Sequence, residues 1–337
     1  MLKFTDYSLL KHNTFGVDVK AKNFIEFNSV EDLKLVLKEP NLQNNRLLVI
    51  GQGSNLLFLN DFDGTVLHSA IKGVDIVEEN EESVVLKVGS GVVVDELIEY
   101  CVSKNWWGIE NLSLIPGEVG AAAVQNIGAY GVEFKDVVQV VKTVRIDDGL
   151  EVDFCNNDCK YAYRESVFKS ELKSKYIITS VVIKLSKIPI YSLSYQHLEA
   201  AVRQKGEINL RNIRQTVIEI RESKLPDPRV IGNAGSFFMN PIVSSEKFIE
   251  LYSIYPNMPH YHISEEEKKI PAAWLIDQCG WKGRSHKRAG VYEKQALVLV
   301  NLGGAKGKDI AELSRKIQMS VEDKFGITLK PEVNFIE

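Results

Sequence analysis

The stretch that decides the fold runs Ile115-Pro116-Gly117-Glu118-Val119-Gly120-Ala121-Ala122-Ala123-Val124-Gln125-Asn126-Ile127-Gly128-Ala129-Tyr130-Gly131. Four glycines and three consecutive alanines among these seventeen residues leave almost no side-chain bulk. The composition predicts a long loop that lies flat against a large planar or phosphorylated ligand. The alternative is a helix whose small residues allow close packing against its neighbours. We call residues 115–131 the second loop.

A first loop, Gly51-Gln52-Gly53-Ser54-Asn55, directly follows a predicted buried strand that ends at Ile50. A glycine-rich turn after a strand presents backbone N–H groups to phosphate, which suggests a nucleotide. The Rossmann fingerprint also needs a third glycine and a helix that begins immediately. Residues 56–59 instead resemble a short extended run followed by a turn, so the Rossmann interpretation fails. Two such loops point to a large dinucleotide bound by a different fold.

The composition is that of an ordinary globular protein. The chain has 337 residues, 45% of them hydrophobic and 26% charged, which predicts two or three domains. A net charge of -4 and a pI near 6.0 argue against general affinity for nucleic acid or anionic membrane. No apolar run approaches the ~20 residues of a spanning helix, and the N-terminus lacks the apolar core of a signal peptide. Four scattered cysteines indicate a reduced, metal-free, cytoplasmic protein.

The order of predicted elements favours an α+β fold. Strands and helices are mixed without regular alternation up to about residue 187, and helical patterns dominate from Tyr191 onward. Predicted strands cover residues 46–50, 65–68, 84–88, 137–146, 176–185 and 296–301. Predicted helices cover residues 30–38, 94–103, 210–222, 244–255, 271–278 and 310–325. Residues 224–228, Lys-Leu-Pro-Asp-Pro, are expected to form a stiff connector.

The most suggestive chemical motif is Gly232-Asn233-Ala234-Gly235-Ser236-Phe237-Phe238, followed by Asn240-Pro241. One hydroxyl beside two aromatic rings is typical of the apolar wall of a small-molecule pocket, with a single polar group on it. The alternative is a tight turn in which Ser236 caps its own backbone. Two further motifs are Tyr163-Arg164-Glu165-Ser166 and Pro331-Glu332-Val333, the latter within a strand-like pattern at residues 329–335.

Taken in order, these loops and motifs closely resemble the UDP-N-acetylenolpyruvoylglucosamine reductase family, from Asn13-Thr14-Phe15-Gly16 to Phe335. The resemblance implies the flavin-binding α+β fold of the vanillyl-alcohol-oxidase type, with a smaller α+β lobe that covers the substrate. It also implies non-covalent FAD, reduction by NADPH, and synthesis of UDP-N-acetylmuramate for peptidoglycan. The stretch around Tyr195 is similar to the subclass with a tyrosine loop over the substrate.

The resemblance also implies roles for individual residues. Ser236 matches the proton donor, and Arg164 and Glu332 match residues around the substrate carboxylate. Matched cofactor contacts are Gly51, Gln52, Gly53, Ser54, Asn55, Pro116, Gly117, Gly128, Tyr130 and Arg221; matched UDP-sugar contacts are Tyr195, Lys224, Asn240 and Gln295. One departure is that Ala121 and Ala122 stand where family members often carry hydroxyl residues, so pyrophosphate contacts there must come from backbone N–H groups. The first loop has no His or Cys for a covalent flavin link.

These residue types suit the chemistry. Hydride addition to an enolpyruvyl ether puts negative charge on the carbon next to the carboxylate, and a guanidinium such as Arg164 can hold that carboxylate in a fixed fork. A serine is a weak acid that serves only against a strongly basic, enolate-like partner. A hydrolase is disfavoured because none of the six histidines forms a matching constellation with Ser236. The residue-level alternatives are a surface ion pair of Arg164 with Glu165 and a solvated Glu332.

The predicted domains are an FAD-binding domain at residues 1–187, with subdomains at about 1–70 and 71–187, a tyrosine loop and connector at 188–210, and a substrate-binding domain at 211–337. The last strand is expected to return to the active site. We expect a monomer with small-molecule partners only. Two other functions stay open at this point: an oxygen-using flavin oxidase of the same fold, and a nucleotide-sugar-binding regulator without activity.

Overall fold

The computed structural model describes residues 1–43, 45–195 and 197–337, which form two compact units. Unit 1 comprises Met1–Tyr7, Ala21–Gln52 and Asp63–Arg221. Unit 2 comprises Ser8–Lys20, Gly53–Phe62 and Glu222–Glu337. The chain therefore passes from one unit to the other within the first loop. The domain boundaries drawn from the sequence stay a prediction.

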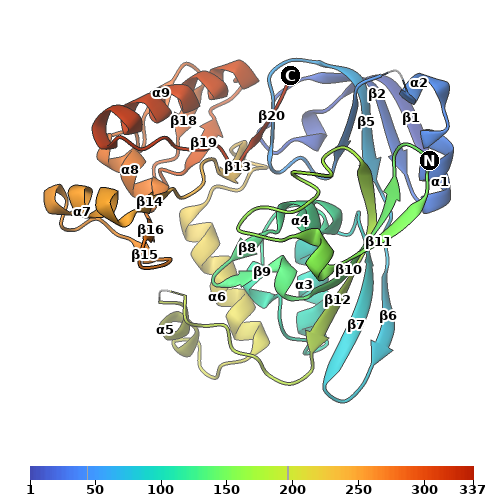
Figure 1. The fold of residues 1–337 in the computed structure, drawn as a ribbon, viewed down its shortest axis with the longest axis horizontal. Helices are drawn as coiled ribbons and strands as arrows, with labels where there is room; N and C mark the ends of the chain where they lie inside the picture. Colours follow the sequence, from blue (N-terminus) through green and yellow to red (C-terminus); the bar gives the residue numbers. More distant parts are fainter. Residues whose placement is uncertain (44, 196) are drawn as a thin grey trace. The chain divides into compact units, whose positions relative to one another are not determined.

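The N-terminal part of unit 1 is built on a four-stranded sheet in the order β1-β2-β5-β3. Figure 1 labels its strands β1, β2 and β5. Its strands are β1 (Leu2–Ser8), β2 (Lys20–Phe27), β5 (Phe62–Ser69) and β3 (Leu47–Ile50), accompanied by α1 (Val30–Leu37) and α2 (Pro40–Gln43). Strands β3 and β5 are parallel, with Ile50 opposite His68. Buried apolar residues of α1, such as Leu33 and Val36, share a core with Phe27 and Leu67 of the sheet.

The second sheet of unit 1 is antiparallel, in the order β11-β10-β12-β7-β6. Its strands are β11 (Glu151–Cys155), β10 (Val138–Arg145), β12 (Tyr176–Ser186), β7 (Ser83–Gly89) and β6 (Val74–Glu79). The helices α3 (Val94–Ser103) and α4 (Val119–Gln125) lie beside this sheet (Figure 1). Their buried residues share its main apolar core. A smaller cluster joins α5 (Leu198–Arg203) and α6 (Leu210–Lys224) to Trp107.

The second loop is partly helical, which differs from the predicted long loop. Residues 119–125 form α4, and only the following residues contribute the short strands β8 (Gly128–Ala129) and β9 (Val132–Glu133). The three alanines favour a helix, and Ala122 and Ala123 are buried in the core. The helix ends at Gln125, and the capping residue Asn126 has a φ of 46°, the left-handed conformation common just after helix ends.

Unit 2 has a four-stranded sheet in the order β13-β19-β18-β17. Its strands are β13 (Asn233–Ser236), β19 (Val298–Asn301), β18 (Ala289–Val291) and β17 (Ser285–His286), and α8 (Ala272–Gln278) and α9 (Gly307–Phe325) complete this layer. A small sheet of β14 (Ile242–Ser244), β16 (Glu267–Lys269) and β15 (Tyr261–His262) carries α7 (Ser245–Ile254). The C-terminal strand β20 (Asn334–Ile336) pairs in parallel with β4 (Leu56–Phe58), the strand that follows the first loop.

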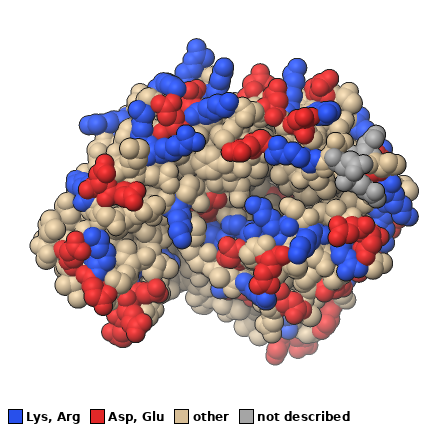
Figure 2. Space-filling model, turned by 45° about the horizontal axis from the view of Figure 1, so that its top comes forward, with Lys and Arg blue, Asp and Glu red and all other residues tan. Residues whose placement is uncertain are grey.

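Charges of both signs are interspersed over the face shown in Figure 2, in keeping with the small net charge of -4. Within the described residues, no helix has both the length and the apolar character needed to cross a bilayer.

Candidate active site

The first loop leads from β3 into the strand β4, not into a helix, which confirms that the Rossmann interpretation fails. Gly53 has a φ of 68°, and a Cβ at this position would lie 1.9 Å from the carbonyl oxygen of His12. The amide of Thr14 donates to the carbonyl of Gly53 across 3.2 Å. Only glycine fits here, because any side chain would collide with the backbone of residues 12–13.

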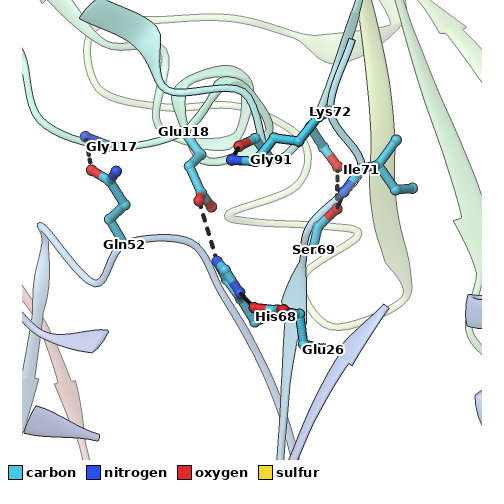
Figure 3. Close-up of polar contacts among 10 residues, drawn as sticks. Glu26, Gln52, His68, Ser69, Ile71, Lys72, Gly91, Gly117 and Glu118 are labelled. Carbon is cyan, nitrogen blue, oxygen red and sulfur yellow. Dashed lines mark hydrogen bonds and ion pairs between the residues drawn. The ribbon is translucent and has the colours of Figure 1, made fainter. Parts of the chain in front are cut away.

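A side-chain bond joins the two loops inside unit 1. The N–H of Gly117 donates to Oε1 of Gln52 across 3.0 Å, and Figure 3 shows the two residues facing each other. Both residues were predicted cofactor contacts. The structure therefore brings together the unit 1 end of the first loop and the beginning of the second.

Arg164 lies against the end of the second loop. Its guanidinium donates to the carbonyl oxygen of Gly128 at 2.6 Å and lies 3.4 Å from that of Asn126. Its backbone φ of 58° is unusual for a residue with a long side chain. These contacts place the Arg164 guanidinium at the end of the second loop, and a guanidinium is suited to binding a carboxylate.

The predicted cofactor residue Tyr130 and the predicted substrate residue Tyr195 meet in unit 1. Their rings pack edge to face with centroids 5.7 Å apart. The fully buried Asn111 donates from Nδ2 both to the carbonyl of Tyr130, at 2.8 Å, and to the carbonyl of Ser192, at 2.7 Å. Asn111 thus fixes the segment before Tyr195 to the second loop. No sequence pattern marked this asparagine, because its partners are backbone atoms 19 and 81 residues away.

Arg221 on α6 carries an unsatisfied donor. Its Nε is buried, and it has no hydrogen-bond partner among the described residues. Burial lowers the pKa of the guanidinium, whereas the nearby Tyr130 and Asp95 act in the opposite direction and Arg164 adds to the lowering. A buried unpaired donor is costly in a folded protein. An acceptor atom from a bound ligand would remove that cost.

Ser236 is the last residue of β13, in unit 2, and it is exposed. The next residues, Phe237 and Phe238, are 0% and 1% exposed, and the N–H of Phe237 donates to the carbonyl of Leu297. The pairing of β13 with β19 is irregular between Asn233 and Ser236. The two aromatic rings are therefore buried in the protein, and they do not by themselves shield the Ser236 hydroxyl from water.

A close backbone approach fixes the beginning of this motif. A Cβ on Gly232 would lie 2.1 Å from the carbonyl oxygen of Phe15, and the N–H of Asn233 donates to the carbonyl of Thr14. Gly232 is thus required for packing against residues 14–15, which belong to the motif at residues 13–16.

Glu332 is held next to Ser236 through backbone bonds. The N–H of Glu332 donates to the carbonyl of Phe237 at 2.8 Å. Nδ2 of Asn55 donates to the carbonyl of Glu332 at 3.1 Å. The bridge between Phe238 and Pro331 continues this pairing. The regular strand begins later than the pattern at residues 329–335 indicated, at Asn334. Unit 2 thus brings together the end of the first loop, the serine motif and the terminal glutamate.

The remaining predicted substrate residues also lie in unit 2. Oδ1 of Asn240 accepts from the N–H of Ala272 at 2.9 Å, and Oε1 of Gln295 accepts from the N–H of Leu297 at 3.3 Å. These bonds orient each amide so that its NH₂ group is the part available to a ligand. Lys224 is exposed and ends α6, so the predicted connector begins one residue later than expected.

Among the described residues, no group of three or more His, Cys, Asp or Glu side chains is arranged to hold a metal ion. The residues of the two loops and Arg221 instead suit FAD. Small residues dominate the two loops, the partly exposed backbone at Gly51 can approach a diphosphate, and the orphaned Nε of Arg221 requires an acceptor.

The fold and these loops define a flavin-binding protein. The model of an FAD binding domain matches residues 21–154, and the model of the UDP-N-acetylenolpyruvoylglucosamine reductase C-terminal domain matches residues 227–336. The predicted α+β class and FAD-binding fold are confirmed.

Sequence relatives identify the family. The UDP-N-acetylenolpyruvoylglucosamine reductase of Bacteroides fragilis is 52% identical over 330 residues, covering 98% of this chain and 99% of that one. The reductase of Porphyromonas gingivalis is 48% identical over 333 residues, covering 98% of each chain. The crystal structure of the Thermus caldophilus reductase shares the fold, with a TM-score of 0.70, 23% identity, and coverage of 100% of this chain and 98% of that one. The chain belongs to the UDP-N-acetylenolpyruvoylglucosamine reductase family, as its motifs predicted.

Proposed function

We propose that the chain reduces the enolpyruvyl ether of UDP-N-acetylglucosamine to UDP-N-acetylmuramate, with FAD bound non-covalently and NADPH as reductant. The reaction is assigned from the membership of the chain in the UDP-N-acetylenolpyruvoylglucosamine reductase family. The single structural observation that supports the assignment of residues is the backbone pairing that holds Glu332 beside the Ser236 motif and the end of the first loop.

The chemistry that FAD supplies when bound is the transfer of a hydride, taken from NADPH, to the terminal carbon of the substrate's double bond. Negative charge then develops on the neighbouring carbon and extends into the carboxylate. Ser236 donates its hydroxyl proton to that carbon, which completes the addition of two hydrogens across the double bond. The resulting alkoxide is reprotonated from solvent, to which Ser236 is exposed.

Arg164 and Glu332 act on the substrate carboxylate. The Arg164 guanidinium, which its bond to the carbonyl of Gly128 holds at the end of the second loop, binds the carboxylate and stabilises the growing charge. Glu332 contributes a polar group beside the proton donor, in the position that its bonds to Phe237 and Asn55 fix.

We assign the remaining contacts as follows. The side chain of Arg221 and backbone groups of both loops hold FAD, together with the side chains of Gln52, Ser54, Asn55 and Tyr130. Tyr195, Lys224, Asn240 and Gln295 hold the UDP-sugar. Residues 1–187 form the FAD-binding domain, residues 188–210 the tyrosine loop and connector, and residues 211–337 the substrate-binding domain. The protein works in the cytoplasm as a monomer.

Separate measurement of the two half-reactions tests the role of Ser236. Reduction of FAD by NADPH does not use the proton donor, so Ser236→Ala keeps a near-normal rate of flavin bleaching under anaerobic conditions. Reoxidation by the enolpyruvyl substrate slows by about 10²–10⁴, the usual effect of losing a general acid. Ser236→Cys retains part of the activity because a thiol also donates a proton.

A matched control is Ser253→Ala, which removes an exposed hydroxyl from α7 and leaves both half-reactions unchanged. Equal slowing of both half-reactions in Ser236→Ala would indicate a structural turn residue. Unchanged rates in both would remove Ser236 from the mechanism. Arg164→Lys is expected to slow reoxidation selectively as well, because a point charge cannot reproduce the guanidinium fork.

A further inference from the structure

We propose that His68 is a positioning residue for the phosphate end of the cofactor site. It holds the buried carboxylate of Glu118 under the first loop and offsets its charge, so that the anionic diphosphate of FAD can bind there. The inference deepens the proposed function and rests on it, because it assumes that the first loop binds the FAD diphosphate.

His68 lies between two carboxylates in unit 1. Its Nδ1 is 2.9 Å from Oε2 of Glu26 on β2, and its Nε2 is 3.2 Å from Oε1 of Glu118. Figure 3 shows the imidazole between the two carboxylates. The side chains of His68 and Glu118 are only 11% and 5% exposed, and that of Glu26 is 26% exposed. The ring of Phe24 stacks on the imidazole with centroids 6.2 Å apart.

The β-sheet places this cluster at the first loop. His68 is opposite Ile50 in the parallel pair β3–β5, and Ile50 is the last residue before Gly51. Glu118, at the start of α4, lies directly against the loop, since a Cβ on Gly51 would be 3.0 Å from its Oε2. The neighbouring bond from Gly117 to Gln52 keeps both segments together.

An uncompensated carboxylate at this position would oppose the binding of an anion. Glu118 is almost fully buried, so its field is weakly screened by water. A diphosphate on the same loop would be repelled by it. A protonated imidazole removes one unit of negative charge from the cluster of two carboxylates, and it fixes the direction in which Glu118 points.

Contacts from both ring nitrogens to carboxylate oxygens favour the protonated ring. A neutral imidazole has one N–H and can donate to only one carboxylate, whereas the imidazolium donates to both. Burial lowers the pKa of His68, but the hydrogen bonds and charges of Glu118 and then of Glu26 outweigh it, so the pKa is raised. The charged form therefore persists to higher pH than in the unfolded chain, and it is lost as the pH rises through the raised pKa.

Affinity for FAD, measured on the apoprotein by flavin fluorescence titration at pH 7, tests the inference without relying on activity. His68→Gln leaves Glu118 charged and is expected to weaken FAD binding at least tenfold, while Glu118→Gln alone retains wild-type affinity or improves it. The double variant His68→Gln/Glu118→Gln is expected to recover most of the loss, because the buried charge of Glu118 that His68 offsets is then absent. His286→Gln is the matched control, since it removes another histidine–carboxylate contact, that of His286 with Glu312 in unit 2, and leaves the affinity unchanged.

The pH profile gives a second readout. The dissociation constant of the wild type for FAD is expected to rise as the pH increases through the titration of His68, whereas the profile of the double variant stays flatter. Thermal unfolding of each apoprotein shows whether it folds, and His68→Asn serves as the alternative if His68→Gln does not.

Three results would overturn the inference. The first is wild-type FAD affinity in His68→Gln, and the second is a double variant that binds as weakly as His68→Gln, which would indicate a purely structural role. In both cases the proposed function stands. The third is a wild-type apoprotein that binds no FAD at all, which would overturn the proposed function together with this inference.

Discussion

At the scale of single residues, Tyr195 offers the clearest test of substrate binding. Its ring packs on Tyr130. Asn111 bonds to the backbone carbonyls of Tyr130 and of Ser192, which lies three residues before Tyr195. If the hydroxyl of Tyr195 bonds to the uridine diphosphate, Tyr195→Phe loses a hydrogen bond to a charged group, worth about 1.5–3 kcal/mol. Substrate binding is expected to weaken by roughly 10- to 150-fold, and the rate of FAD reduction by NADPH to stay unchanged.

Equilibrium binding of the sugar nucleotide to Tyr195→Phe and Tyr195→Ala checks this expectation. Loss of affinity in Tyr195→Ala alone would mean that the ring packs on Tyr130 without bonding the substrate. Wild-type affinity in both variants would remove Tyr195 from the site.

Residue roles were predictable where several residues formed an ordered motif, as around Ser236 and Glu332. The structure brings these two segments together through bonds of Glu332 to Phe237 and Asn55, partners that no local pattern reveals. Asn111 and His68 were missed because each is an isolated polar residue. Their importance comes from backbone and carboxylate partners that only the folded chain places beside them.

At the scale of secondary-structure elements, Asp95 links α3 to α6 and to Leu114, the residue just before the second loop. Arg214 on α6 donates to both of its oxygens, at 2.6 and 3.1 Å, and the N–H of Leu114 donates at 2.6 Å. Burial raises the pKa of this carboxyl, but the bond from Arg214 and then that from Leu114 outweigh it, so the pKa is lowered. The link orients the helix that carries Arg221.

Replacement of Asp95 by Asn is therefore expected to reduce the free energy of unfolding of the apoprotein by about 1–3 kcal/mol at pH 7. Because the folded-state pKa is depressed, this contribution is full above the ordinary value of 3.8 and is lost as the pH falls through the folded-state pKa. Urea unfolding at pH 7 and at lower pH measures the difference, which must shrink on acidification.

Asp63→Asn is the matched control, since its ion pair with Lys22 is well exposed, and a change within about 0.5 kcal/mol is expected. An equal loss for Asp95→Asn at both pH values would contradict the role of the charged carboxylate.

The predicted elements agree closely with the observed ones where periodicity was strong, as in α3, which has the predicted bounds. The second loop was predicted only in part. Its glycines suggested a continuous loop, but three alanines and burial against the sheet of unit 1 favour the helix α4. Tertiary packing, which the sequence does not display, decided between the two alternatives.

At the scale of the whole molecule, the mode of flavin attachment follows from the composition of the two loops. Neither the first loop nor residues 116–131 contain His or Cys, so neither provides a nucleophile for a covalent link. Acid precipitation of the purified holoprotein is expected to release all flavin into the supernatant. Flavin that stays on the protein pellet would contradict non-covalent binding.

The central claim is that this chain passes electrons from NADPH, through FAD, to an enolpyruvyl sugar nucleotide. An anaerobic spectrophotometric titration of the wild-type holoprotein tests it most directly. One equivalent of NADPH per FAD is expected to bleach the flavin absorbance, and one equivalent of the enolpyruvyl ether of UDP-N-acetylglucosamine is then expected to restore it without oxygen. Absorbance that NADPH does not bleach would indicate a binding protein, and recovery only on admission of oxygen would indicate an oxidase; either result would contradict the account.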